Sequence, residues 1–311
     1  MASSKKSIYS ALAANLLIAV TKFIAGAVSN SSAMIAEGVH SVVDTINQLL
    51  LLLGIRLSKK KPDKYHPLGY GKELYFWSFV VSIMIFGLGG GISIYQGILH
   101  ILHPIELGNP KWSYVVLSLS IVFEGSSLII AAIEFNKIRN GQSWWQAIVN
   151  SKDPSTFLVL FEDAAAVLGL LIVLICLWLS HHLNKPFIDG VASLLVGLLL
   201  VFVSMILARE SRSLLMGEGI SKKTKVRVRA IVEEDASVLR LMHLLSSYQS
   251  PEEVLLMLIV AFKPDQNTAQ INDAIDRIRD HIKAEYRLIK FVIIQPEVYE
   301  RRVDPNIQKY I

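Results

Sequence analysis

Apolar residues dominate six long stretches in the first two thirds of the chain. They run over about 8–29, 33–57, 75–102, 112–136, 155–180 and 187–208. A helix needs roughly 20 mostly apolar residues to cross a bilayer, so each stretch predicts one membrane-spanning helix. The first stretch is too long for a signal peptide, and the second follows it within a few residues. The pattern predicts an all-α bundle of six spanning helices over 1–208.

After residue 208 the apolar runs become shorter and polar residues separate them. Ile271, Ile275, Ile278 and Ile282 recur at 4-3-4 spacing, which is typical of an amphipathic helix. The runs EEVLLMLIVAF and LIKFVIIQPEV predict buried strands, and DASVLRLMHLLSSY favours a strand although its pattern is ambiguous. KKTKVRVRAIV fits a strand or a short helix, and we favour the helix. The segment 209–311 is therefore predicted to be a small cytoplasmic α/β domain of order α-β-β-α-β.

Composition supports this division. Apolar residues make up 52% of the chain and charged residues 18%, against about 25% charged in a soluble domain. The charge is uneven, with 25 charged residues in 1–208 and 32 in 209–311. So apolar a chain excludes a soluble enzyme, a disordered chain and a nucleic-acid-binding domain, despite the net charge of +5. The single cysteine, Cys176, excludes an internal disulfide framework and a Cys-cluster metal site.

Lysine and arginine in the loops give an orientation. If the N-terminus lies inside, eleven cations fall in inner segments and only Lys111 and Lys185 fall in outer loops. The inner cations are Lys5, Lys6, Arg56, Lys59, Lys60, Lys61, Lys64, Lys72, Lys137, Arg139 and Lys152. Because cytoplasmic loops carry an excess of Lys and Arg, both termini are predicted to be cytoplasmic. A short N-terminus without a leader favours a bacterial inner membrane.

Several ionisable residues fall inside the predicted spans, where such groups mark an ion or substrate path. His40 and Asp44 are four residues apart and so share one helix face, where they can ligate a divalent metal or form a packing hydrogen bond. Glu162 and Asp163 are adjacent and point about 100° apart, so one of them can instead pair with Lys22 or another helix. Together these groups favour a shared metal site.

Two further acidic residues have other interpretations. Glu124 lies in a run of small residues, FEGSSLIIAA, and can relay protons or form a hydrogen bond. Asp189 begins the sixth span and favours a helix cap or a group at the membrane edge. His100 and His103 are expected at the membrane edge.

The motif SSAMIAEGVHSVVDTINQ, followed by PDKYHPLGYGKE, resembles the second-span signature of the cation diffusion facilitator family. DPSTFLVLFEDAAAVLGLL and EGSSLIIAAIE are similar to the zinc transporter nine-like subgroup. The resemblance implies a homodimeric, proton-coupled exporter of divalent metals, most often zinc. It also keeps an organelle membrane open beside the bacterial one.

The resemblance implies a transport site with two residues from the second span and two from the fifth. His40 and Asp44 match the first pair, and Asp163 matches the fifth-span aspartate. Val159 stands where the family usually has a His or Asp, which leaves the fourth position to Glu162, water or an unidentified group.

Two other places depart from the family pattern. Asp63 and His66 are similar to a secondary metal site after span two, but Tyr70 replaces its further histidine. The last tail strand, FVIIQPE, lacks the metal-binding His of some members. A tail that dimerises without a binuclear metal site is therefore expected.

The sequence thus predicts a proton-coupled efflux transporter for a divalent cation, not an enzyme. Zn²⁺ is the favoured transported substrate, and one imidazole with two or three carboxylates leaves Mn²⁺, Fe²⁺ and Co²⁺ open. Its partners are the metal ion, protons, the lipid bilayer and a second copy, with no nucleic acid. The alternatives are an intramembrane metal-dependent hydrolase and a degenerate family member acting as a scaffold.

Overall fold

The structure is a computed structural model that describes residues 2–105, 108, 110–139 and 141–297. The chain forms two compact units. The bundle unit holds the chain up to Lys61 together with Lys72–Ser213. The tail unit holds Pro62–Gly71 together with the chain from Leu214 onward.

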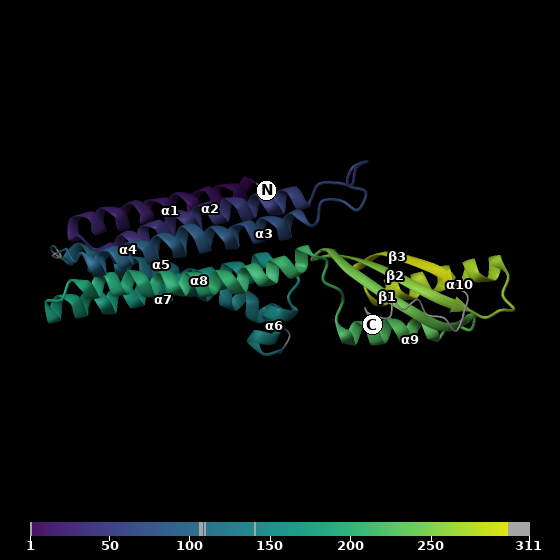
Figure 1. The fold of residues 1–311 in the computed structure, drawn as a ribbon. Helices are drawn as coiled ribbons and strands as arrows, with labels where there is room; N and C mark the ends of the chain where they lie inside the picture. Colours follow the sequence, from purple (N-terminus) through teal and green to yellow (C-terminus); the bar gives the residue numbers. More distant parts are fainter. Residues whose placement is uncertain (1, 106–107, 109, 140, 298–311) are drawn as a thin grey trace. The chain divides into compact units, whose positions relative to one another are not determined.

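The bundle unit consists of long helices (Figure 1). They are α1 (Ala2–Ser29), α2 (Ser32–Ser58), α3 (Glu73–Met84), η1 (Ile85–Gly91), α4 (Ile92–Leu102), α5 (Lys111–Ile138), α6 (Trp144–Asn150), α7 (Pro154–Leu183) and α8 (Phe187–Leu215). Within the part of the chain that the structure describes, five segments are long and apolar enough to cross a membrane, with α3, η1 and α4 forming one of them. The first predicted span, 8–29, lies in α1, whose apolar part is the shorter stretch Asn15–Ser29. The predicted helical membrane domain is confirmed.

Local chemistry sets the start of the two helices that carry the candidate site. Ser31 precedes α2, and its hydroxyl accepts a hydrogen bond from the Met34 amide. Asp153 caps α7 in the same way, accepting from the Ser155 amide, while Pro154 occupies the first turn. Proline is favoured there because the first amides of a helix have no intrahelical acceptor. These caps fix where the buried polar groups fall along each helix.

The third span contains a π-helical stretch, η1, which the apolar pattern did not predict. In the following part of this span, α4, small residues allow close backbone contact with α8. A Cβ added to Gly97 would lie 2.6 Å from the Leu194 amide nitrogen, and one added to Gly197 would lie 2.7 Å from the amide of Ile94. Such contacts are typical of small-residue interfaces between membrane helices.

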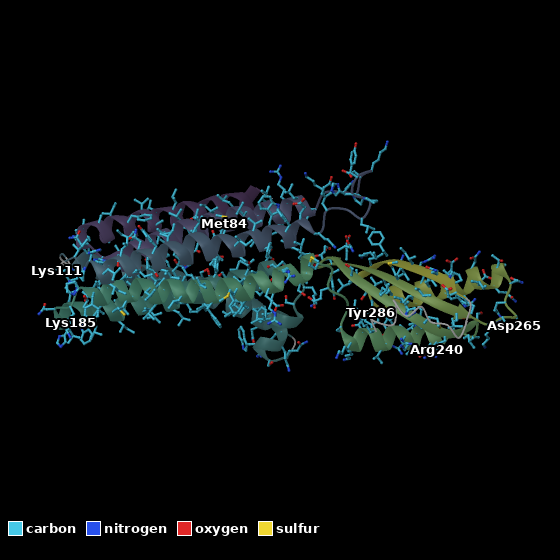
Figure 2. All side chains as sticks on the ribbon, in the orientation of Figure 1. Met84, Lys111, Lys185, Arg240, Asp265 and Tyr286 are labelled. Carbon is cyan, nitrogen blue, oxygen red and sulfur yellow. The ribbon has the colours of Figure 1, made fainter. Side chains whose placement is uncertain are left out.

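Figure 2 labels Lys111 and Lys185 at the same end of the bundle. These are the two cations of the predicted outer loops. Since α5 begins at Lys111 and α8 begins just after Lys185, the two helices start at the same end.

The tail unit has the predicted α-β-β-α-β order. It comprises α9 (Lys222–Glu233), β1 (Val238–Ser250), β2 (Glu253–Phe262), α10 (Thr268–Glu285) and β3 (Ile289–Glu297). β2 is the central strand, antiparallel to β1 and parallel to β3, with α10 as the crossover. Ile278 and Ile282 of α10 share a buried core with Leu256 and Leu258 of β2.

The units differ from the predicted division at 208 in two ways. Helix α8 continues to Leu215, because its polar last turns still follow the helical pattern and bury Ser211 and Leu214. The loop 62–71 groups with the tail residues. Gly71 explains this grouping, because its backbone lies so close to the carbonyl oxygen of Gln249 that a Cβ there would clash with it.

Candidate metal centre

His40 and Asp44 lie one turn apart on α2, as their spacing predicts. His40 Nδ1 is 3.3 Å from Asp44 Oδ1, and both residues are buried. Both ring nitrogens of His40 and Oδ1 of Asp44 lack a hydrogen-bond partner among the described residues. Buried polar atoms are normally paired, so these atoms are available to a ligand.

Glu162 and Asp163 of α7 point toward different helices, as adjacent helical residues must. Glu162 Oε1 accepts a hydrogen bond from Asn47 Nδ2 of α2 at 2.9 Å. Asp163 Oδ2 accepts one from the Ser127 hydroxyl of α5 at 2.7 Å. Among the described contacts, Lys22 pairs with Glu37 and Glu124 and with neither of these residues. Each of the two instead contacts a different helix. Glu162 and Asp44 also line the same small cavity.

A small polar cavity of about 20 Å³ lies between these helices. A volume of this size holds one water-sized occupant. It is lined by Asn15, Ile18, Ser41, Asp44, Gln48, Glu124, Glu162 and Asp163. Four carboxylates from three helices therefore face one cavity, with His40 beside Asp44.

The described residues do not present a finished coordination shell. No group of three or more His, Cys, Asp or Glu side chains among them is close enough to hold one metal ion. The structure pairs His40 with Asp44 and brings Asp44, Glu162 and Asp163 to the same cavity. A metal ion would need to draw these side chains together.

Asn47 is a site residue that the sequence analysis missed. Its amide bridges α2 to Glu162, while its Oδ1 is buried without a partner among the described residues. Its position was readable from the sequence, because His40, Asp44 and Asn47 follow the 4-3 spacing of one helix face. An amide oxygen there is a further candidate for the position that Val159 leaves open.

Glu124 belongs to a second polar cluster beside the cavity. Its Oε1 lies 3.8 Å from Nζ of Lys22, which also contacts Glu37 at 3.2 Å. Glu124 thus lines the cavity and faces a buried cation at once. This geometry is compatible with both roles predicted for Glu124, a proton relay and a hydrogen-bonding group.

Asp63 and His66 lie together in the loop 62–71, with Nδ1 of His66 3.5 Å from Oδ1 of Asp63. The Tyr70 hydroxyl donates to Asp63 Oδ2 at 2.6 Å, and the amides of Tyr65 and His66 donate to Oδ1. The hydrogen bond from Tyr70 is the main reason that the pKa of Asp63 lies below its usual range. Both carboxylate oxygens of Asp63 therefore already accept hydrogen bonds from residues of the loop.

Asp189 acts as a cap, although for a different helix from its own. It lies at the start of α8 and accepts hydrogen bonds from the hydroxyl of Ser32 and the amide of Ala33 at the start of α2. His100 Nδ1 lies 3.4 Å from the same carboxylate. His100 is buried beside this carboxylate and lies two residues before the end of α4.

Membrane-length helices that enclose a cavity lined by carboxylates define a polytopic membrane protein with an acidic interior. The chain belongs to the cation efflux family, also called the cation diffusion facilitators, since the family's cation efflux transmembrane domain matches residues 8–216. The resemblance drawn from the second-span motif is thereby confirmed.

Three relatives show how the similarity is distributed. The human proton-coupled zinc antiporter SLC30A9, mitochondrial, is 37% identical over 230 residues, covering 73% of this chain and 40% of the human protein. Metal tolerance protein C4 of Arabidopsis thaliana is 32% identical over 237 residues, covering 76% of this chain and 52% of that protein. The manganese efflux system protein MneP of Bacillus subtilis is 26% identical over 303 residues, covering 95% and 96%. The chain therefore spans well under two thirds of the first two relatives and nearly all of the third.

Proposed function

We propose that this protein carries divalent metal cations, with Zn²⁺ as the main substrate, across a membrane in exchange for protons. The observation that carries the proposal is the set of unpartnered buried atoms of His40 and Asp44 beside a cavity shared with Glu162 and Asp163. An imidazole together with carboxylates suits Zn²⁺ and also admits harder ions such as Mn²⁺. The names of the relatives, which include a zinc antiporter and a manganese efflux protein, support the same class of substrate.

The proposed ligands are His40, Asp44 and Asp163, with Glu162 or Asn47 completing the set. Two helices hold them, so tilting α7 against α2 would open or close the shell. The excess of Lys and Arg in the inner segments supports the proposal that both termini lie on the cytoplasmic side. Metal would then leave the compartment that holds the tail. A bacterial inner membrane remains our prediction, and the organelle alternative has the support of the mitochondrial relative's name.

Metal uptake into proteoliposomes tests the function. Purified full-length protein should accumulate Zn²⁺ in vesicles with an acidic lumen, because metal is exchanged for luminal protons. Empty vesicles are the control. A hydrolase would show turnover of a lipid or peptide without vectorial uptake, and a scaffold would show neither, so either result would replace the transporter proposal.

Replacing Glu162 with Gln should weaken Zn²⁺ affinity at least about tenfold. A loss of this size is typical when a group that orients a metal ligand is removed. The reason is that Gln keeps the size of the side chain but removes its charge beside Asp44. Isothermal titration calorimetry of the detergent-solubilised protein measures the effect, with the exposed Glu134→Gln as the matched control. Retained affinity with an altered pH dependence would assign Glu162 to the proton path instead.

The tail is proposed to form the dimer through the open face of its sheet. Leu245, Met257 and Ile293 lie side by side on adjacent strands and are 46%, 41% and 52% exposed. The alternate residues Leu256 and Leu258 face the helix-covered core. An exposed apolar row on an otherwise charged domain marks an interaction surface.

The variant Met257→Glu should convert the full-length protein in detergent from dimer to monomer, because it places like charges opposite each other across a two-fold interface. Light scattering coupled to size exclusion measures the mass. Lys283→Glu, on the exposed side of α10, is the control. A dimer unaffected by Met257→Glu would exclude this face as the contact.

A further inference from the structure

Lys22 is a fully buried lysine in the apolar part of α1. Its ammonium donates to the Ser41 hydroxyl at 2.8 Å and to Glu37 Oε2 at 3.2 Å, and it lies 3.8 Å from Glu124 Oε1. An ammonium has three donors and no acceptor. Its three oxygen neighbours come from α2 and α5, so the group is surrounded as a bound cation would be.

The lysine does not engage every oxygen atom in the cluster around it. Glu37 is 0% exposed, and its Oε1 has no hydrogen-bond partner among the described residues. Gly169 of α7 provides the space for this oxygen, because a Cβ at that position would lie 2.9 Å from it. A buried carboxylate thus keeps one free oxygen on the side facing α7.

This cluster adjoins the candidate transport site. Ser41 and Glu124 contact Lys22 and also line the cavity that contains Asp44, Glu162 and Asp163. Glu37 lies three residues before His40 on the same helix. Five carboxylates therefore gather in one region of the bundle, and Lys22 is the one lysine or arginine that the described contacts place among them.

Stability does not require this arrangement. Burying an ion pair costs desolvation that its attraction only partly offsets, and apolar residues of similar size often serve a core as well. Charged groups inside membrane spans are usually functional. The position of the pair beside the cavity points to a role in cation binding.

We propose, resting on the proposed function, that Lys22 is a tethered cation that occupies a second cation subsite formed by Glu37, Glu124 and Ser41. The lysine takes the place of a second divalent ion, so that the acidic cluster accepts only one metal at His40, Asp44 and Asp163. Without the ammonium, the subsite presents two carboxylates and a hydroxyl. Such an all-oxygen set favours a hard cation such as Mn²⁺ over Zn²⁺.

The test is the number of Mn²⁺ and Zn²⁺ ions bound per protomer by the full-length protein, measured by equilibrium dialysis and elemental analysis. The variant Lys22→Met should bind one Mn²⁺ more than the wild type. Adding Glu37→Gln to it should remove the extra ion, and Lys22→Arg, which keeps the positive charge, should bind as many ions as the wild type. Equal metal content in Lys22→Met and the wild type would overturn the subsite.

A folding defect in Lys22→Met also gives an answer. If the variant is unstable in chelator, Mn²⁺ but not Na⁺ should restore its melting temperature, because the divalent ion replaces the missing ammonium. Failure of Mn²⁺ to do so would overturn the proposal. A wild-type protein that binds no metal at all would instead refute the proposed function.

Discussion

Asp163→Ala is expected to reduce Zn²⁺ transport in proteoliposomes by about 100-fold or more. Losing a group that merely orients a metal ligand costs 10–100-fold in affinity or activity, and losing a ligand itself costs at least as much. The carboxylate of Asp163 lines the cavity and is held by Ser127, so alanine removes both the charge and the contact to α5. His40→Ala should have a loss of similar size, because it removes the imidazole from the candidate set.

The matched control is Glu134→Ala, an exposed carboxylate on α5 that should leave transport unchanged. Size exclusion of each variant shows whether the protein remains folded. Wild-type transport by folded Asp163→Ala would remove this residue from the ligand set. Ser127→Ala separates the two roles of Asp163, since it removes the hydrogen bond while leaving the carboxylate in place.

The sequence predicted those features that depend on local periodicity. The long apolar stretches became membrane-length helices because a spanning segment must satisfy its own backbone hydrogen bonds. Ile278 and Ile282 became core residues of α10 because their spacing puts them on one face. His40 and Asp44 met for the same reason, four residues apart on α2.

Features that depend on distant contacts were not predictable in this way. The partner of Lys22 is Glu37 on a different helix, and helical spacing within one segment says nothing of which helix lies alongside. The loop 62–71 joins the tail unit through a close contact at Gly71, which no loop composition indicates. The π-helical stretch at Ile85–Gly91 lies close to α8 at Gly90, while its residues fit an ordinary apolar helix.

The chemistry of the same cavity gives a physical basis for the proposed proton coupling. Asp44, Glu162 and Asp163 line one small cavity, and carboxyl groups gathered so closely repel one another when all of them are ionised. Metal binding requires a neutral imidazole and ionised carboxylates, so an arriving metal ion must displace the protons that these groups hold. Several bare charges in a water-poor pocket are unfavourable, so in the proposed exchange the empty carrier would take up protons again before it returns.

Zn²⁺ binding is accordingly expected to release at least one proton per ion, and Zn²⁺ affinity should rise with pH as the competing protons leave. The affinity rises with pH, and does not fall, because protons and metal compete for the same atoms. Calorimetry in buffers of different ionisation enthalpy measures the released protons from the slope of the apparent heat. Vesicle flux under an imposed pH gradient measures the coupling, and uptake should be faster into an acidic lumen than into a neutral one. Apparent heats that do not vary with the buffer, combined with flux that ignores the gradient, would require a uniporter, because metal would then move without exchanging for the protons of Asp44 and Glu162.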